Sequence, residues 1–128
     1  MARVVFDASA VIALLRGEPG SALIADHVGD AMISTVNLQE VIKALMVRGI
    51  SIALAREMID ALHLEVQAHT ELDAYQAAAL YPDTAQHGSS LGDRTCLALA
   101  IREGLEVITT DRAWAALNLP GLRVVLAR

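Results

Sequence analysis

Five short apolar runs alternate with longer stretches of helical periodicity along this chain of 128 residues. We interpret the short runs as buried strands, and the longer stretches, whose apolar residues recur every three or four positions, as helices. Strands that alternate with helices form a parallel sheet with helices on both faces. The prediction is a single α/β domain over residues 1–128, a length that one hydrophobic core can serve. The predicted strands are residues 3–7, 31–34, 64–68, 106–110 and 123–126.

The stretches between the strands predict helices, and the composition fits them. Hydrophobic residues make up 55% of the chain and charged residues 20%, which excludes a disordered chain. Aromatic residues are only 3%, so Ala, Leu, Val and Ile must build the core. The one clearly polar segment, residues 82–90, is predicted to be a loop. The predicted helices are residues 8–15, 21–27, 37–48, 52–62, 71–80 and 93–102.

Several classes of protein are excluded by what the sequence lacks. The single cysteine, Cys96, excludes an internal disulfide and a cysteine-rich zinc module, and we expect a reducing, cytoplasmic location. The longest early apolar run, residues 8–15, is far shorter than the roughly 18 residues of a membrane span. There is no glycine-rich phosphate loop, so no nucleotide cofactor is expected.

The net charge of −5 argues against a plain nucleic-acid-binding module, which normally has a basic excess. This argument weakens if some of the carboxylates hold a metal ion. Setting aside four of the 15 acidic residues leaves 11 against 10 basic residues, which is close to neutral.

Four of the carboxylates fall at positions that suit a metal site. Asp7 and Asp111 lie at the carboxyl ends of the first and fourth predicted strands, while Glu40 and Asp93 fall in the first turns of two predicted helices. Ligands of parallel sheets bind outside the carboxyl ends of the strands, so we expect the four side chains to converge there. Close carboxylates repel one another, and a divalent cation removes the conflict. Oxygen ligands without thiols or paired histidines favour Mg²⁺ or Mn²⁺.

Each of these acids also fits a simpler role as a helix cap. A side-chain oxygen before a helix accepts hydrogen bonds from free backbone N–H groups, and a reciprocal pair three residues apart forms a capping box. The two roles are compatible, because a helix amino terminus favours a carboxylate. The candidate caps are Asp7, the pairs Asn37 with Glu40 and Ser90 with Asp93, and Asp111 before a short helix that contains Trp114.

Taken together, four segments resemble the PIN-domain ribonucleases, specifically the VapC-like toxins of bacterial toxin–antitoxin modules. They occur in the order and spacing of that family, and the similarity covers nearly the whole chain. The segments are Val5-Phe-Asp7-Ala-Ser9-Ala, Asn37-Leu-Gln-Glu40-Val, Ser90-Leu-Gly-Asp93-Arg-Thr-Cys-Leu-Ala and Thr109-Thr-Asp111-Arg-Ala-Trp114.

The resemblance implies a three-layer sandwich around a five-stranded parallel sheet, and cleavage of RNA that depends on Mg²⁺ or Mn²⁺. It also implies a homodimer and a VapB-like antitoxin whose tail covers the acidic site. The acids that match the catalytic and metal-binding quartet of the family are Asp7, Glu40, Asp93 and Asp111. The residues that match supporting positions are Ser9, Asn37 and Thr110.

Other residues and other functions stay open at this point. Arg94 and Arg112 each follow an acid of the quartet, where they fit either a contact to RNA phosphates or a surface ion pair. We expect Trp114 to be a packing residue rather than a base-stacking one, and Cys96 to be a buried small hydrophobe. The alternatives to a ribonuclease toxin are a phosphoesterase that acts on DNA or small phosphate esters, and a non-catalytic partner-binding module whose acids are only caps.

Overall fold

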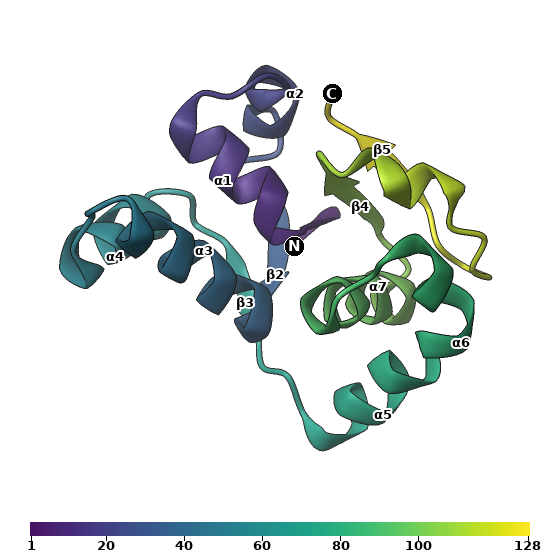
Figure 1. Ribbon diagram of the computed structural model, residues 1–128. Coiled ribbons are helices and arrows are strands. Elements are labelled where there is room, and N and C mark those ends of the chain that lie inside the picture. Colours follow the sequence, from purple (N-terminus) through teal and green to yellow (C-terminus); the bar gives the residue numbers. More distant parts are fainter.

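The computed structural model describes all 128 residues and contains one five-stranded sheet in the order β3-β2-β1-β4-β5 (Figure 1). Every neighbouring pair of strands is parallel, which confirms the predicted α/β class. Each strand lies within one of the predicted apolar runs. The strands are β1 (Val4–Phe6), β2 (Ala31–Ser34), β3 (Glu65–Gln67), β4 (Glu106–Thr109) and β5 (Val124–Leu126).

Helices cover both faces of the sheet, so the molecule has three layers, as predicted. Four helices, α1 to α4, pack on one face, while α7 and the 3₁₀ turn η2 pack on the other and α5 lies against α7 (Figure 1). No helix is long and apolar enough to cross a membrane. The helices are α1 (Ala8–Arg16), α2 (Ser21–Ala25), α3 (Thr35–Val47), α4 (Ile52–Asp60), α5 (Glu71–Ala79), α6 (Tyr81–Thr84) and α7 (Leu91–Glu103), with the 3₁₀ turns η1 (Ala85–His87) and η2 (Arg112–Ala116).

The central strands are largely apolar because both of their faces are buried. In β1, Val4 and Phe6 belong to the core beneath α1 to α4, whereas Val5 belongs to the core beneath α7. Phe6 and Val5 have no exposed surface, and burial of a side chain of this size stabilises the fold by about 1.5–3 kcal/mol. This two-sided burial explains why the strand pattern is continuous rather than alternating.

Several predicted boundaries are wrong by about two residues, such as the start of α7 at Leu91 rather than at Asp93, and two differences have clear local reasons. The predicted loop at residues 82–90 contains α6 and η1, because Pro82 lies in the first turn of α6, where no backbone N–H is needed. Helix α3 begins at Thr35 rather than at Asn37, since the hydroxyl of Ser34, the last residue of β2, accepts the N–H of Val36 and caps the helix.

The strand order places a topological switch between β1 and β4. From β1 the chain moves outward through β2 to β3, and it then returns to the other side of β1 for β4 and β5. In sheets of this kind, the crevice for a ligand forms at the carboxyl ends of the two strands beside the switch. Asp7 directly follows β1, and Asp111 lies two residues after the end of β4.

Candidate active site at the carboxyl ends of β1 and β4

Asp7 is the most buried of the four candidate acids, with 5% of its surface exposed. Its Oδ1 accepts the N–H of Ala10 at 2.9 Å, so it caps α1 as expected. Burial raises the pKa of Asp7 to about 6 against the opposing effect of hydrogen bonds from Thr109, Ala10 and Ser9, and the negative charge of Asp93 adds to the rise. A cation close to Asp7 would therefore stabilise its charged form.

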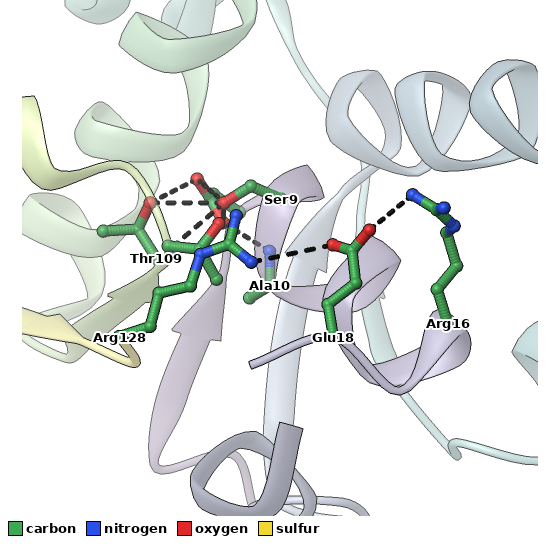
Figure 2. Close-up of polar contacts among 8 residues, drawn as sticks. Ser9, Ala10, Arg16, Glu18, Thr109 and Arg128 are labelled. Carbon is green, nitrogen blue, oxygen red and sulfur yellow. Dashed lines mark hydrogen bonds and ion pairs between the residues drawn. The ribbon is translucent and has the colours of Figure 1, made fainter. Parts of the chain in front are cut away.

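Two hydroxyl groups tie the end of β1 to the end of β4 (Figure 2). The Ser9 hydroxyl lies 2.8 and 2.9 Å from the two carboxylate oxygens of Asp7, and its oxygen accepts the Thr110 N–H at 3.1 Å. The Thr109 hydroxyl donates to Asp7 Oδ2 at 2.7 Å and accepts the Asp111 N–H at 2.9 Å. The hydroxyl groups therefore orient Asp7 and link it to the segment that carries Asp111.

Thr109 is a site residue that the sequence analysis missed, because Thr110 was named in its place. Thr110 contributes its backbone N–H to this network, whereas the fully buried Thr109 contributes its side chain. The register between β1 and β4 pairs Phe6 with Ile108, which sets Thr109 opposite Asp7. The signal that identifies Thr109 is therefore the pairing of β1 with β4, which the sequence pattern alone does not give.

Asp93 lies in the first turn of α7 and forms the predicted capping box with Ser90. The Ser90 hydroxyl accepts the Asp93 N–H at 3.1 Å, and Asp93 Oδ2 accepts the Ser90 N–H at 3.0 Å. The other carboxylate oxygen, Oδ1, accepts no hydrogen bond from the protein. One oxygen of Asp93 therefore caps the helix while the second is free for a ligand.

Glu40 is not part of a capping box, because Ser34 caps α3 and Glu40 falls in the second turn of the helix. Instead its Oε1 accepts a hydrogen bond from the Asn37 amide nitrogen at 2.7 Å. The same nitrogen donates to the carbonyl oxygen of Gly92 in α7 at 2.9 Å. The carboxylate of Glu40 thus lies against the start of α7, beside the residue that precedes Asp93.

Asp111 is the most exposed of the four acids and follows Thr110 at the end of β4. Its Oδ1 accepts the Ala113 N–H at 3.0 Å and caps the short 3₁₀ turn η2, as expected. Its second oxygen accepts no hydrogen bond from the protein. Asp111 is connected to the rest of the site through its backbone N–H, which binds the Thr109 hydroxyl.

The charges of three of the acids act on the buried thiol of Cys96, which lies in α7. Burial raises the pKa of Cys96 well above its usual value, and the charges of Asp7, Asp93 and Glu40 raise it further. Cys96 is fully buried, as expected, and its Sγ lies 3.8 Å from the carbonyl oxygen of Phe6. The carboxyl ends of β1 and β4 are therefore a region of concentrated negative charge.

A hard divalent cation fits this set of donors. The four carboxylates are oxygen ligands of the type that Mg²⁺ and Mn²⁺ prefer, and Glu40, Asp93 and Asp111 each have one oxygen without a protein partner. In their present rotamers, no three His, Cys, Asp or Glu side chains converge closely enough to hold a metal ion. Direct ligation by all four acids therefore requires side-chain movement, and the quartet stays a prediction.

The basic residues near the site are partly engaged in other contacts. The Arg94 guanidinium donates to the carbonyl oxygen of Ser89 at 2.9 Å and lies 5.4 Å from the ring centre of Tyr81. Arg112 is exposed beside Asp111 and forms no ion pair. Glu18 pairs with Arg16 and with Arg128, the latter at 3.9 Å (Figure 2). Arg112 is thus free of the kind of contacts that hold Arg94.

Trp114 is a packing residue, with only 2% of its surface exposed in the core beneath α7. This burial excludes stacking of a nucleobase on the indole ring in the present conformation. Its indole N–H has no hydrogen-bond partner.

Comparisons with known proteins agree with this architecture. The family model described as PIN domain matches residues 4–118. Among solved structures, a toxin–antitoxin complex from Klebsiella pneumoniae is 21% identical with a TM-score of 0.74 over 98% of both chains. DNA-bound VapBC from Salmonella typhimurium is 17% identical with a TM-score of 0.75 over the full length of both chains. FitAcB from Neisseria gonorrhoeae is 18% identical with a TM-score of 0.73 over 97% of both chains. At these identities the likeness is one of fold. No curated protein sequence matches the chain.

Proposed function

The chain belongs to the PIN domain family. We propose that it is a metal-dependent endoribonuclease that acts as the toxin of a toxin–antitoxin pair. The observation that carries the proposal is the buried carboxyl group of Asp7, whose pKa is raised to about 6, at the switch point of the sheet. Perturbed carboxyl groups at such a point are typical of catalytic sites rather than of structural caps.

In this proposal Asp7, Glu40, Asp93 and Asp111 hold Mg²⁺ or Mn²⁺. When bound, the cation would lower the pKa of water and neutralise charge on the phosphate of the substrate. Since the four carboxylates repel an RNA backbone in its absence, we expect the cation to bind before productive RNA binding.

The other side chains orient these acids or contact RNA. Ser9 and Thr109 fix both oxygens of Asp7 through their hydroxyl groups. Thr110 adds a backbone contact to the same network. Arg112, and Arg94 after release from Ser89, are the candidates for contacts to the phosphates that flank the scissile bond.

The experiment that tests the catalytic proposal is cleavage of total RNA by the purified protein with Mg²⁺ or Mn²⁺. Asp93→Asn is the matched variant, since asparagine retains the oxygen that caps α7 and removes the charge. We expect the wild type to cut RNA, and both Asp93→Asn and the EDTA control to leave it intact. Cleavage by a folded Asp93→Asn variant at the wild-type rate would refute the role of the quartet.

Two further substrates separate this proposal from the other functions. Hydrolysis of single-stranded DNA or of a generic phosphodiester in preference to RNA would identify a phosphoesterase. If the acids are only caps, Mn²⁺ should not bind at millimolar concentration, and Asp93→Asn should leave every property of the protein nearly unchanged.

An apolar groove supports the proposed protein partner. It lies between α3 and α4, has a volume of about 460 Å³, and is lined mainly by aliphatic side chains. Nearby Met46 and Val47 are exposed, and large exposed apolar surfaces mark sites of association. The structural relatives are toxin–antitoxin complexes, which favours a VapB-like antitoxin as partner. The main lining residues are Leu38, Ile42, Ile52, Ala53, Ile59 and Val66.

The toxin role predicts that induction of the wild type, but not of Asp93→Asn, arrests bacterial growth. The proposed homodimer predicts a mass of twice 13.6 kDa by light scattering. Normal growth after induction of an enzyme that cuts RNA in vitro would leave the nuclease proposal standing and refute the toxin role.

A further inference from the structure

Glu40 differs from the other three acids because no helix cap fixes its carboxylate. It lies in the second turn of α3, where a side chain has no free backbone N–H within reach. Its carboxylate accepts a hydrogen bond from the Asn37 amide and lies where a side chain on Gly92, in the first turn of α7, would point. The position of Glu40 therefore depends on contacts between two helices.

Asn37 bridges the two helices through a single nitrogen. Its amide nitrogen has two hydrogens, which go to Glu40 Oε1 at 2.7 Å and to the Gly92 carbonyl oxygen at 2.9 Å. Both partners are acceptors, so the reversed amide would set oxygen against oxygen, and the orientation of Asn37 is thereby fixed. Only 2% of Asn37 is exposed, and its Oδ1 is buried without a partner. Because a buried acceptor without a partner is unfavourable, the oxygen does not explain why an amide is buried at position 37. The two hydrogen bonds of the nitrogen do.

Gly92 supplies the space that the Glu40 carboxylate occupies. A Cβ atom on Gly92 would lie 2.6 Å from each carboxylate oxygen of Glu40 and 2.7 Å from its carboxyl carbon. The backbone of Gly92 does not itself require glycine, since Gly92 is not among the residues with positive φ. Alanine is also the better residue for a helix. The missing side chain at position 92 therefore serves Glu40 and not the helix.

We propose that Asn37 and Gly92 are positioning residues that together hold the Glu40 carboxylate against the start of α7, beside Asp93. Asn37 holds one carboxylate oxygen, and Gly92 leaves the volume that the carboxylate fills. This inference rests on the proposed function, because it treats Glu40 as a metal ligand that Asn37 and Gly92 align. Partners that orient metal ligands typically contribute about 10–100-fold to metal affinity.

Gly92→Ala is the sharpest test, because it is expected to weaken metal binding without lowering stability. The added methyl group meets the end of a flexible side chain, so Glu40 swings away and the fold survives. We expect an apparent melting temperature in EDTA equal to or above that of the wild type. Mn²⁺ binding by calorimetry should weaken about 10–100-fold. Wild-type Mn²⁺ affinity in folded Gly92→Ala would overturn the proposal.

A double-mutant cycle with Glu40→Ala shows whether both residues act through Glu40. In the Glu40→Ala background, Gly92→Ala and Asn37→Ala should cause no further loss of Mn²⁺ affinity. An equal loss in both backgrounds would mean that the substitutions distort the helices, and it would refute the assignment. Gln39→Ala, which removes an exposed amide from the neighbouring position of α3, is the control and should bind Mn²⁺ as the wild type does. If Asn37→Ala fails to fold, the Gly92→Ala arm decides alone.

The outcomes separate this inference from the proposed function. If the wild type binds Mn²⁺ and cuts RNA while Gly92→Ala matches it in both, the proposed function stands and the positioning role of Asn37 and Gly92 is refuted. If the wild type neither binds Mn²⁺ nor cuts RNA, the proposed function and the positioning role both fail. If the wild type is active, Gly92→Ala should also lower kcat when Mn²⁺ is below saturation. The factor should be similar to its loss of Mn²⁺ affinity. KM for RNA should change little.

Discussion

Replacement of Asp7 by asparagine should make the metal-free protein more stable at neutral pH. Asp7 is 5% exposed, and its pKa in the folded protein is about 6 against an ordinary value of 3.8. Asparagine has a similar shape and retains an oxygen for the Ala10 N–H, so α1 stays capped. The substitution therefore removes mainly the unfavourable burial of a charge.

The magnitude follows from the difference between the two pKa values. Because the folded state binds the proton of Asp7 more tightly than the unfolded state, stability falls as the pH rises from about 4 through 6. A difference of about 2 pKa units corresponds to about 3 kcal/mol. Below pH 4 the two proteins should be about equally stable. Near pH 8 Asp7→Asn should be more stable by up to about 3 kcal/mol, or roughly 10 °C in melting temperature for a chain of this size.

The assay is urea unfolding in EDTA at intervals between pH 4 and pH 8. Asp26→Asn is the control, because Asp26 is exposed and its replacement should change stability by less than about 0.5 kcal/mol at every pH. A stability difference that stays flat with pH, or that favours the wild type more as the pH rises, would refute the argument from burial. With saturating Mn²⁺ the order should reverse, since a ligand that binds the folded wild type stabilises it.

Three further substitutions test other parts of the structure. Asp73→Ala should lower stability by about 1–2 kcal/mol at pH 7, measured by urea unfolding, because Asp73 accepts the Thr70 N–H and pairs with Arg102 at 2.6 Å. Burial raises the pKa of Asp73, but the Thr70 hydrogen bonds and Arg102 outweigh burial and hold this pKa below its usual value. The loss of stability should therefore shrink as the pH falls below about 4, and a loss that stays constant with pH would contradict this prediction. Trp114→Phe should lower the melting temperature and leave KM for RNA unchanged, whereas a raised KM would indicate base stacking. Gly20→Ala should destabilise the protein by more than about 1 kcal/mol, since its φ is 95° and a Cβ would lie 2.6 Å from the Ala127 carbonyl oxygen; wild-type stability would show that the carboxyl-terminal segment moves freely.

The inner strands β1, β2 and β4 were predictable from sequence because they are largely apolar and buried on both faces, whereas the edge strands β3 and β5 are partly exposed. All five lie within the predicted segments, and their alternation with helices leads to the parallel three-layer fold. The start of α3 was not predictable in the same way, since Ser34 ends β2 and caps α3 at once. Residues 82–90 were also misread, because proline and serine are typical both of loops and of the first turns of short helices.

The site was predictable to the extent that its residues follow strands or open helices. Asp7, Asp93 and Asp111 occupy such positions, and all three cap the elements that were expected. The contacts of Thr109 and Gly92 were not predictable, because they depend on which strands and helices are neighbours. Thr109 reaches Asp7 across the β1–β4 pair, and Gly92 meets a side chain 52 positions earlier in the sequence, Glu40.

Glu40 is the acid that discriminates between helix caps and a metal site. Asp7, Asp93 and Asp111 each cap a helix with one oxygen, so their presence fits either interpretation. Glu40 caps nothing, and it is held by a buried amide whose own oxygen has no partner. If the acids were only caps, Glu40→Gln should change neither stability nor Mn²⁺ binding, because glutamine offers the same oxygen to Asn37. If they hold a metal ion, Glu40→Gln should keep the fold and lose most of the RNA cleavage, since the amide removes a charged ligand and little else.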